Sequence, residues 1–260
     1  SWEEMKEMKA SGLVDIQSHA LTHTWYPVNN KIIDYRHPGD KYIWMTWNNY
    51  PEKKPYLQYD DKNLINLGEP VYEFEKSLSE KRYFPDPELS NYLITHVKNN
   101  GGKLFFKNNE WRKILNDKVT EFKNNNSVND KIETDQEYFN RIKTELSESK
   151  RVIEANLSKK VNYLCWPGGS STKKGVEIAR KLGFKLSTAG KDILNYRKNI
   201  PNSPVMKTDR IFRFGPGLYW NGIKGKGSII LYKRGVNLII NLLQFQNRFG
   251  MKYFGIIYFK

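Results

Sequence analysis

Apolar and polar positions along the chain repeat with two periods, which predicts an α/β fold. Residues 1–12 have the spacing of a capped helix that ends at glycine, and the apolar residues 13–16 that follow predict a buried strand. Residues 147–154, 161–166, 173–182 and 184–188 repeat the order helix, strand, helix, strand. Alternating helices and strands are typical of an α/β protein.

The region between these segments has a different composition. Nine aromatic residues lie between positions 25 and 59, mixed with Asn, Pro and Lys. Aromatic faces beside polar groups suit sugar rings, but they equally suit a small aromatic core of this region, and both interpretations stay open. Further on, residues 76–100 and 110–123 predict two helices, and the polar run 123–130 predicts a loop.

Two of the four histidines, His19 and His23, lie at the end of the first predicted strand, with three residues between them. Neutral imidazoles at this spacing can converge on one ion, which suits a catalytic zinc with few protein ligands and one open position. Ala20 stands where the zinc-protease signature has glutamate, so that signature is excluded. A pair of surface or packing histidines is the alternative.

Residues 11–23, 149–157, 164–169 and 177–184 together resemble motifs of the polysaccharide deacetylase family, carbohydrate esterase family 4 with chitooligosaccharide deacetylase-like domains. The resemblance implies a deformed (β/α) barrel, N-terminally incomplete and carrying a large insertion. Residues 1–24 and 136–216 would form the discontinuous barrel core. Residues 25–135 would be the aromatic-rich insertion, and residues 217–260 a basic C-terminal extension packed on the core.

The same resemblance implies a metal-dependent hydrolase that removes acetyl groups from an N-acetylated polysaccharide. A zinc-bound water would attack the amide carbonyl, with Zn²⁺ or another divalent metal held by His19 and His23, and the backbone N–H of Gly168 would stabilise the oxyanion. Family members of this kind act outside the cell or at its surface. The remaining site residues expected are five substrate contacts and one arginine that orients a carboxylate: Trp166, Pro167, Trp25, Trp44, Trp47 and Arg210.

The chain departs from the family pattern where the acid–base chemistry is expected. No Asp-Asp pair precedes the histidines, Asp60-Asp61 lies in a polar region after them, and Asp15 is about 13 Å from His19 along an extended chain. Either the chain starts after the first strands of such a domain, or the domain has lost the aspartates and its activity with them. The rival functions are therefore a non-catalytic glycan-binding or scaffold domain and a basic anion-binding module.

Histidine and cysteine residues elsewhere in the chain are further candidates for the chemistry. No histidine follows position 96, so the family's late general acid is missing; His37, in a turn-rich segment, is the substitute, whereas His96 has the spacing of a packing residue on a helix. Cys165 stands at the family's arginine position, and we interpret it as a buried strand cysteine that does not act as a nucleophile.

The charge is unevenly distributed. The chain carries a net charge of +15, and residues 205–260 contribute +9 of it. Such a surface can bind an anionic polymer or a membrane surface, or it is only a solvated basic face; no nucleic-acid motif accompanies it. The most apolar tract, 236–243, is too short to span a bilayer. The sequence shows no signal peptide, which says little about location, and the cytoplasm is the alternative to the cell surface.

Overall fold

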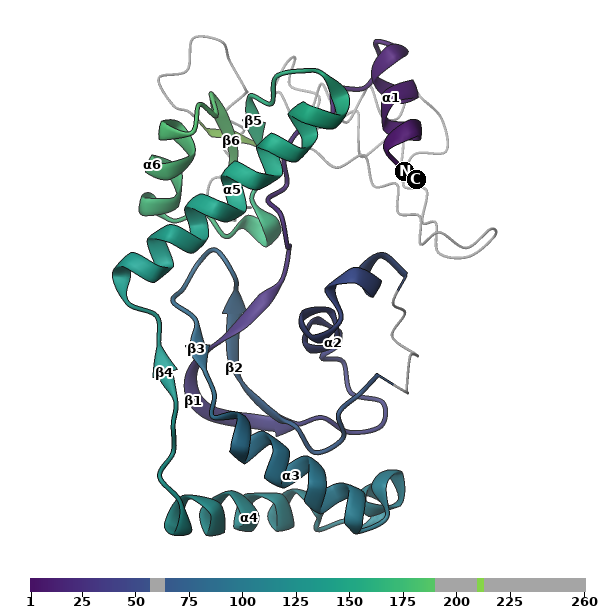
Figure 1. Ribbon diagram of the computed structural model, residues 1–260, viewed down its shortest axis with the longest axis vertical. Helices are drawn as coiled ribbons and strands as arrows, with labels where there is room; N and C mark the ends of the chain where they lie inside the picture. The colour runs from purple at the N-terminus through teal and green to yellow at the C-terminus, as the bar shows by residue number, and fades with distance from the viewer. Residues whose placement is uncertain (57–63, 190–209, 213–260) are drawn as a thin grey trace, which may run out of the picture.

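The computed structural model describes residues 1–56, 64–189 and 210–212, which form a mixed arrangement of helices and strands. Figure 1 shows two groups of elements, joined by the segment from α1 to β1 and by the segment from β4 into α5. The upper group contains α1 (Trp2–Ala10), α5 (Asp135–Leu157), β5 (Tyr163–Leu164), η3 (Pro167–Gly169), α6 (Lys173–Lys181), β6 (Leu186–Ala189) and β7 (Arg210–Phe212). The lower group contains β1 (Trp25–Tyr35), α2 (Ile43–Asn49), η1 (Pro51–Tyr56), β2 (Pro70–Lys76), β3 (Tyr83–Phe84), α3 (Pro87–Asn99), η2 (Gly102–Lys107), α4 (Trp111–Asn125) and β4 (Lys131–Ile132). Among the helices of these residues, none is both long enough and apolar enough to cross a bilayer.

The sheets are small. β5, β6 and β7 form a parallel sheet in that order, and Ser18 adds one parallel bridge to Leu164 beside β5. β1 pairs with β2, and β3 with β4, in both cases antiparallel. The described residues thus contain the predicted mixture of helices and strands but no closed sheet, and the barrel stays a prediction.

Two sequence-based expectations for the secondary structure are wrong. Residues 13–16 form no strand, and Leu13 is 90% exposed, because pairing with β5 begins only at Ser18. The helix expected from residue 76 begins instead at Pro87, where Asp86 accepts the Glu88 N–H as N-cap. An apolar run of four residues is too short to define a strand by itself, whereas the Asp-Pro pair was a readable helix start.

Three other expectations are confirmed. α1 begins with a capping box between Ser1 and Glu4, α4 covers the second predicted helix of the middle region, and α6 begins at the N-cap Thr172. The predicted strand 161–166 is shorter than expected and consists of Tyr163–Leu164. Arg210 lies in β7, and the apolar tract 236–243 lies outside the described residues.

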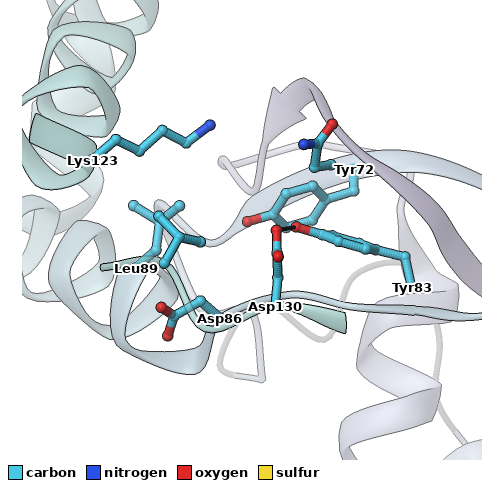
Figure 2. A pocket seen from close by; sticks show the side chains of 8 residues that line it. Tyr72, Tyr83, Asp86, Leu89, Lys123 and Asp130 are labelled. Carbon is cyan, nitrogen blue, oxygen red and sulfur yellow. Dashed lines mark hydrogen bonds between the residues drawn. The ribbon is translucent and has the colours of Figure 1, made fainter. Parts of the chain in front are cut away.

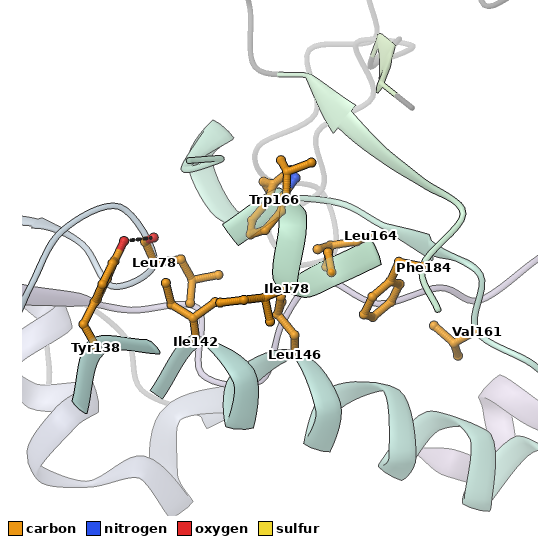
Figure 3. Close-up of a cluster of buried hydrophobic side chains, with 11 residues drawn as sticks. Leu78, Tyr138, Ile142, Leu146, Val161, Leu164, Trp166, Ile178 and Phe184 are labelled. Carbon is orange, nitrogen blue, oxygen red and sulfur yellow. Dashed lines mark hydrogen bonds between the residues drawn. The ribbon is translucent and has the colours of Figure 1, made fainter. Parts of the chain in front are cut away.

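The upper group is held together by apolar side chains of α5, β5 and α6. Tyr138, Ile142 and Leu146 recur every four residues on α5 and face Leu164 and Ile178 (Figure 3). This spacing puts them on one helix face. The lower group has two cores of its own, one between α3 and α4 and one around Trp44, Met45 and Val71.

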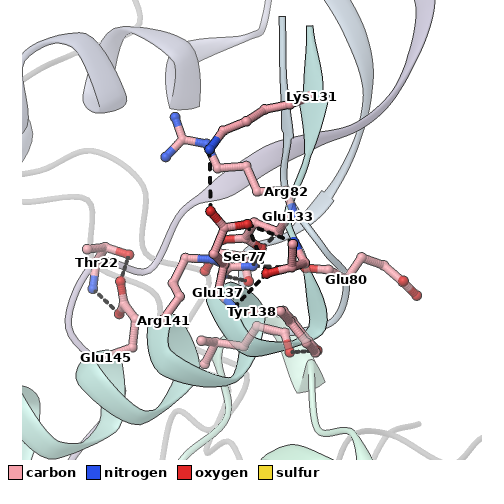
Figure 4. Close-up of polar contacts among 12 residues, drawn as sticks. Thr22, Ser77, Glu80, Arg82, Lys131, Glu133, Glu137, Tyr138, Arg141 and Glu145 are labelled. Carbon is pink, nitrogen blue, oxygen red and sulfur yellow. Dashed lines mark hydrogen bonds and ion pairs between the residues drawn. The ribbon is translucent and has the colours of Figure 1, made fainter.

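A polar stripe on α5 accompanies the apolar one and consists of Arg141, Glu145 and Ser149, again every four residues. Arg141 forms a bidentate ion pair with the buried Glu133, at 2.6 and 2.7 Å, and also donates to the Ser77 and Glu80 carbonyls (Figure 4). Burial opposes the ionised form of Glu133, but the hydrogen bonds from Arg141 and from the Arg82 N–H outweigh it, so the pKa of Glu133 is lowered. Arg141 therefore ties the lower group to α5.

We predict that Leu146→Ala will reduce the free energy of unfolding by about 2–5 kcal/mol, because it leaves a cavity in the core of the upper group. Leu146 is fully buried. Urea unfolding followed by circular dichroism measures the change. Leu104→Ala is the control, since Leu104 is 62% exposed and should lose no more than about 0.5 kcal/mol. Equal losses for the two variants would contradict the packing described above.

Candidate functional site

The segment that carries the two histidines is anchored to the edge of the parallel sheet. The Ser18 N–H donates to the Tyr163 carbonyl at 3.3 Å, and the Cys165 N–H donates to the Ser18 carbonyl at 2.9 Å. The Ser18 hydroxyl also contacts the Ser149 hydroxyl of α5 at 2.7 Å, in the protein interior. His19 therefore directly follows a residue that is held in place beside β5.

The structure brings the two histidine rings together. Their centroids are 4.8 Å apart, with a tilt of 47° between the ring planes. Ala20 and His23 have φ angles of 61° and 43°, a region that side chains other than glycine rarely adopt, and these angles curl residues 18–24 into a tight turn. The close approach of the rings thus depends on a strained backbone.

The orientation of the His19 ring is set by one backbone group. His19 Nδ1 lies 2.7 Å from the Cys165 carbonyl oxygen. A carbonyl only accepts, so Nδ1 is the donor and carries a proton, and Nε2 is the nitrogen with which this ring could bind a metal ion. Metal-binding histidines typically donate their second nitrogen to a carbonyl or carboxylate in this way.

Glu145 holds the turn between the two histidines. This residue is 6% exposed, and its carboxylate accepts hydrogen bonds from the Leu21 N–H at 3.1 Å, the Thr22 N–H at 2.9 Å and the Thr22 hydroxyl at 2.7 Å. Figure 4 shows the Glu145 side chain of α5 directed toward Thr22. We call these residues, Leu21, Thr22 and Glu145, the carboxylate clamp.

Lys54 binds the same turn from the lower group. Its ammonium donates to the carbonyls of Thr22 and His23, the latter at 2.9 Å. Burial lowers the pKa of Lys54, and the Glu145 carboxylate opposes that shift. The Glu145 carboxylate therefore binds N–H groups of this turn, and the Lys54 ammonium binds its carbonyls.

Two of the predicted aromatic substrate contacts lie beside the histidines. Trp25 meets the His23 ring edge-on at 5.8 Å and lies 6.3 Å from the Trp47 ring. The Lys54 ammonium lies 4.9 Å above the Trp47 ring. Both indoles are half-buried, so they retain accessible surface next to the turn.

The other predicted substrate contacts have buried side chains. Trp44 is 6% exposed and packs against Phe74, and Trp166 is fully buried in the core of the upper group; Pro167 is buried as well. Trp44 is thus part of a small aromatic core of the middle region, which was one of the two interpretations of its aromatic residues. An indole enclosed by core residues has no surface to offer a sugar ring, which corrects the expectation for Trp44 and Trp166.

Gly168 is exposed and has a left-handed φ of 54° at the tip of η3. The side chain of Lys76 lies against it: a methyl group on the Gly168 Cα would be 2.8 Å from Lys76 Cε. Lys76 pairs with Trp25 across β1 and β2. The loop proposed to donate an N–H therefore lies near the strand ends that carry Trp25 and a lysine.

His37 lies elsewhere. It follows the far end of β1 from His23 and packs against Trp111 at 5.3 Å, with Nε2 3.7 Å from Asp34. This placement among the α3–α4 residues gives the general-acid expectation no geometric support, because the ring is part of a separate cluster. His96 packs edge-on against Phe105, as its helical spacing predicts.

Among the residues that the structure describes, no third metal ligand joins the histidines. Within residues 1–56, 64–189 and 210–212, His, Cys, Asp and Glu side chains form no group of three or more that could hold an ion. Asp15 is paired with Lys159, whose hydrogen bond lowers the pKa of that carboxyl. Asp60 and Asp61 lie outside the described residues, and of Arg210 only the backbone, in β7 beside Ser187, is described.

Sequence reasoning missed the carboxylate clamp and Lys54. A signal for Glu145 was available, because a carboxylate directly before Leu146 interrupts the apolar face of α5, and ionisable residues are rarely buried without partners. Lys54 gave no such signal in its polar, lysine-rich surroundings.

Comparison with known proteins supports the resemblance seen in the sequence. Residues 112–187 match the polysaccharide deacetylase family, a segment that runs from α4 through α5, η3 and α6 into β6. Similar solved structures include the deacetylase domain of BpsB from Bordetella bronchiseptica (15% identity, TM-score 0.44) and a de-N-acetylase from Aggregatibacter actinomycetemcomitans (18% identity, TM-score 0.40). Each match covers 82% of this chain and 47% of the other, so the chain spans about half the length of those proteins. No curated protein matches the chain.

We predict that Glu145→Ala will loosen the histidine turn and cost about 2–3 kcal/mol of unfolding free energy, because it leaves donors of Leu21 and Thr22 without an acceptor. Hydrogen exchange of the Leu21 and Thr22 amides should accelerate. Glu145→Gln keeps a carbonyl oxygen and should retain most of the protection.

Glu148→Ala is the control for this prediction, since Glu148 lies on the same helix but pairs with Arg151 at the surface. Unchanged exchange of both amides in Glu145→Ala would show that the clamp does not hold the turn.

Proposed function

From the polysaccharide deacetylase match over residues 112–187, we propose that this chain belongs to a hydrolase that removes acetyl groups from an N-acetylated polysaccharide. One observation carries the proposal to this chain's own residues: His19 and His23 lie ring to ring, and the Cys165 carbonyl orients His19. A glycan substrate agrees with the half-buried Trp25 and Trp47 beside them.

His19 and His23 would hold a divalent metal, with zinc the best fit to two imidazoles. The residues present fit such an ion in part, since His19 Nδ1 contacts a carbonyl as it does in metal-binding histidines, while the described residues form no group of three ligands. A bound ion supplies Lewis acidity toward the acetyl carbonyl and toward a water nucleophile.

The chain's own groups would do the rest. Gly168, at the exposed tip of η3, would donate its N–H to the developing oxyanion, and the Lys76 ammonium beside it would add positive charge. Trp25 and Trp47 would orient the sugar ring by apolar contact. The carboxylate clamp and Lys54 would keep the histidines in place while the substrate binds.

The finer fold and location belong to the same proposal. The parallel sheet β5–β6–β7, with Ser18 beside β5, would be part of a deformed barrel with residues 25–135 inserted into it. A polysaccharide substrate favours action outside the cell or at its surface. Binding of an anionic polymer or a membrane by residues 217–260 remains a prediction, since these lie outside the described residues.

A second candidate function is a glycan-binding domain without catalysis. It is favoured by the lack, within the described part of the chain, of a carboxylate that joins the two histidines as ligand or base. Metal binding and acetate release separate the two functions.

We predict that the full chain binds about one zinc ion and that His19→Ala/His23→Ala abolishes this binding. Zinc content after dialysis and isothermal titration measure stoichiometry and affinity. His96→Ala is the matched control, because His96 packs on α3 away from the turn and should leave zinc binding unchanged.

Acetate release from an N-acetylated oligosaccharide is then assayed with the zinc-loaded chain. Release that is lost in the double variant supports the hydrolase, and zinc binding without release supports the non-catalytic domain. A chain that binds no zinc would overturn the proposed metal site.

A further inference from the structure

A hollow in the lower group is lined by polar and aromatic side chains. Its volume is about 200 Å³, and Tyr72, Tyr83, Asp86, Leu89, Lys123 and Asp130 contribute to its wall. Figure 2 shows these side chains converging from β2, β3, α3, α4 and the segment before β4. None of them takes part in the histidine site.

Tyr72 places an unused hydrogen-bonding group in this hollow. Its side chain is 4% exposed, and its hydroxyl makes no hydrogen bond to any residue that the structure describes. Figure 2 shows the hydroxyl directed toward the space between Leu89 and Asp130. Burial, with the charges of Asp130 and Asp86, raises the pKa of Tyr72, so the hydroxyl stays protonated and available as a donor. The hydroxyl borders the hollow, where it can pair with a ligand group or with water.

The two carboxylates differ in how far they are already used. Asp86 is 3% exposed and accepts the N–H groups of Glu88 and Asn129, both at 2.8 Å, with one oxygen each. Asp130 accepts the Tyr83 hydroxyl with Oδ2, and its Oδ1 remains an acceptor for a ligand. Both oxygens of Asp86 are thus already occupied, and Asp130 is the carboxylate with capacity to bind.

The hollow has an excess of acidic side chains, whereas the whole chain is basic. Two carboxylates face one ammonium, that of Lys123, in a protein whose net charge is +15. An anionic ligand finds more favourable surface elsewhere, whereas a cationic group is attracted here. The tyrosine rings and Leu89 supply apolar surface beside these polar groups, a combination that suits a small ring with hydroxyls.

We propose that this hollow binds one amino-sugar unit that carries a free, protonated amino group. The ammonium would lie at Asp130, a sugar hydroxyl would accept from Tyr72, and the apolar ring face would lie on Leu89 and the tyrosines. The proposal rests on the proposed function, because a free amine is what removal of an acetyl group produces. The hollow would then hold a deacetylated unit of the polymer while the histidine site acts on another.

The hollow and the proposed catalytic site both involve residues of strand β2. Tyr72 and Lys76 belong to the same strand, β2, and are about 13 Å apart along it. Lys76 lies against Gly168 at the proposed catalytic site. One strand therefore links the hollow to the proposed catalytic site.

Binding of glucosamine, N-acetylglucosamine and glucose to the full chain tests the proposal, by ligand-observed NMR and isothermal titration. Glucosamine should bind at least about tenfold more tightly than the two uncharged sugars. Tyr72→Phe should weaken it about three- to tenfold, the equivalent of one hydrogen bond. Asp130→Asn should remove the preference for the amine.

Tyr92→Phe is the matched control, since the Tyr92 hydroxyl bonds to Glu121 on the surface, and this variant should bind as the parent does. Each variant's unfolding curve is recorded to check folding, and Tyr72→Phe keeps the ring that packs on Tyr83.

Equal affinity for the three sugars, or binding that Tyr72→Phe leaves unchanged, would overturn the proposal, as would a hollow that holds water only. Binding that disappears in His19→Ala/His23→Ala would assign it to the histidine site instead. If the chain binds no zinc and releases no acetate but still prefers glucosamine, the proposed function fails and the amino-sugar site stands.

Discussion

The polar stripe on α5 is the constraint on which the arrangement of the molecule depends. Arg141, Glu145 and Ser149 follow one another at one-turn intervals, and each binds a different part of the chain. Arg141 holds the lower group through Glu133, Glu145 holds the histidine turn, and Ser149 holds Ser18 at the sheet edge. Because α5 also carries the apolar stripe of the upper core, one rigid helix relates the core to the site. Buried charges of this kind are stable only when paired, so the stripe also specifies which segments meet.

The local part of this organisation could be predicted from the sequence. Capping residues and spacing gave α1, α4 and α6, and the spacing of His19 and His23 anticipated that their rings approach each other. The start of α3 and the missing strand at residues 13–16 were mispredicted, because local apolar content was given more weight than the pairing partner. The carboxylate clamp joins residues 124 positions apart, a relation that no local pattern encodes.

The aromatic residues of the middle region show why composition alone did not decide their role. Trp44 stabilises a core with Met45 and Val71, while Trp25 and Trp47 lie next to His23. Within 23 positions the same residue type thus occurs both as a buried core side chain and as half-buried side chains beside the histidine turn. Charge behaves likewise: a strongly basic chain still forms a local hollow with excess negative charge.

The long separation between the histidine turn and its clamp sets the order in which the site can form. A ribosome releases His19 and His23 well before Glu145, and the turn has positive φ angles that an isolated peptide disfavours. The histidines therefore acquire their geometry only after α5 has been synthesised and has docked. Until then, a nascent chain of this protein carries two adjacent imidazoles on an unstructured segment, free to meet any metal ion in the compartment where translation takes place.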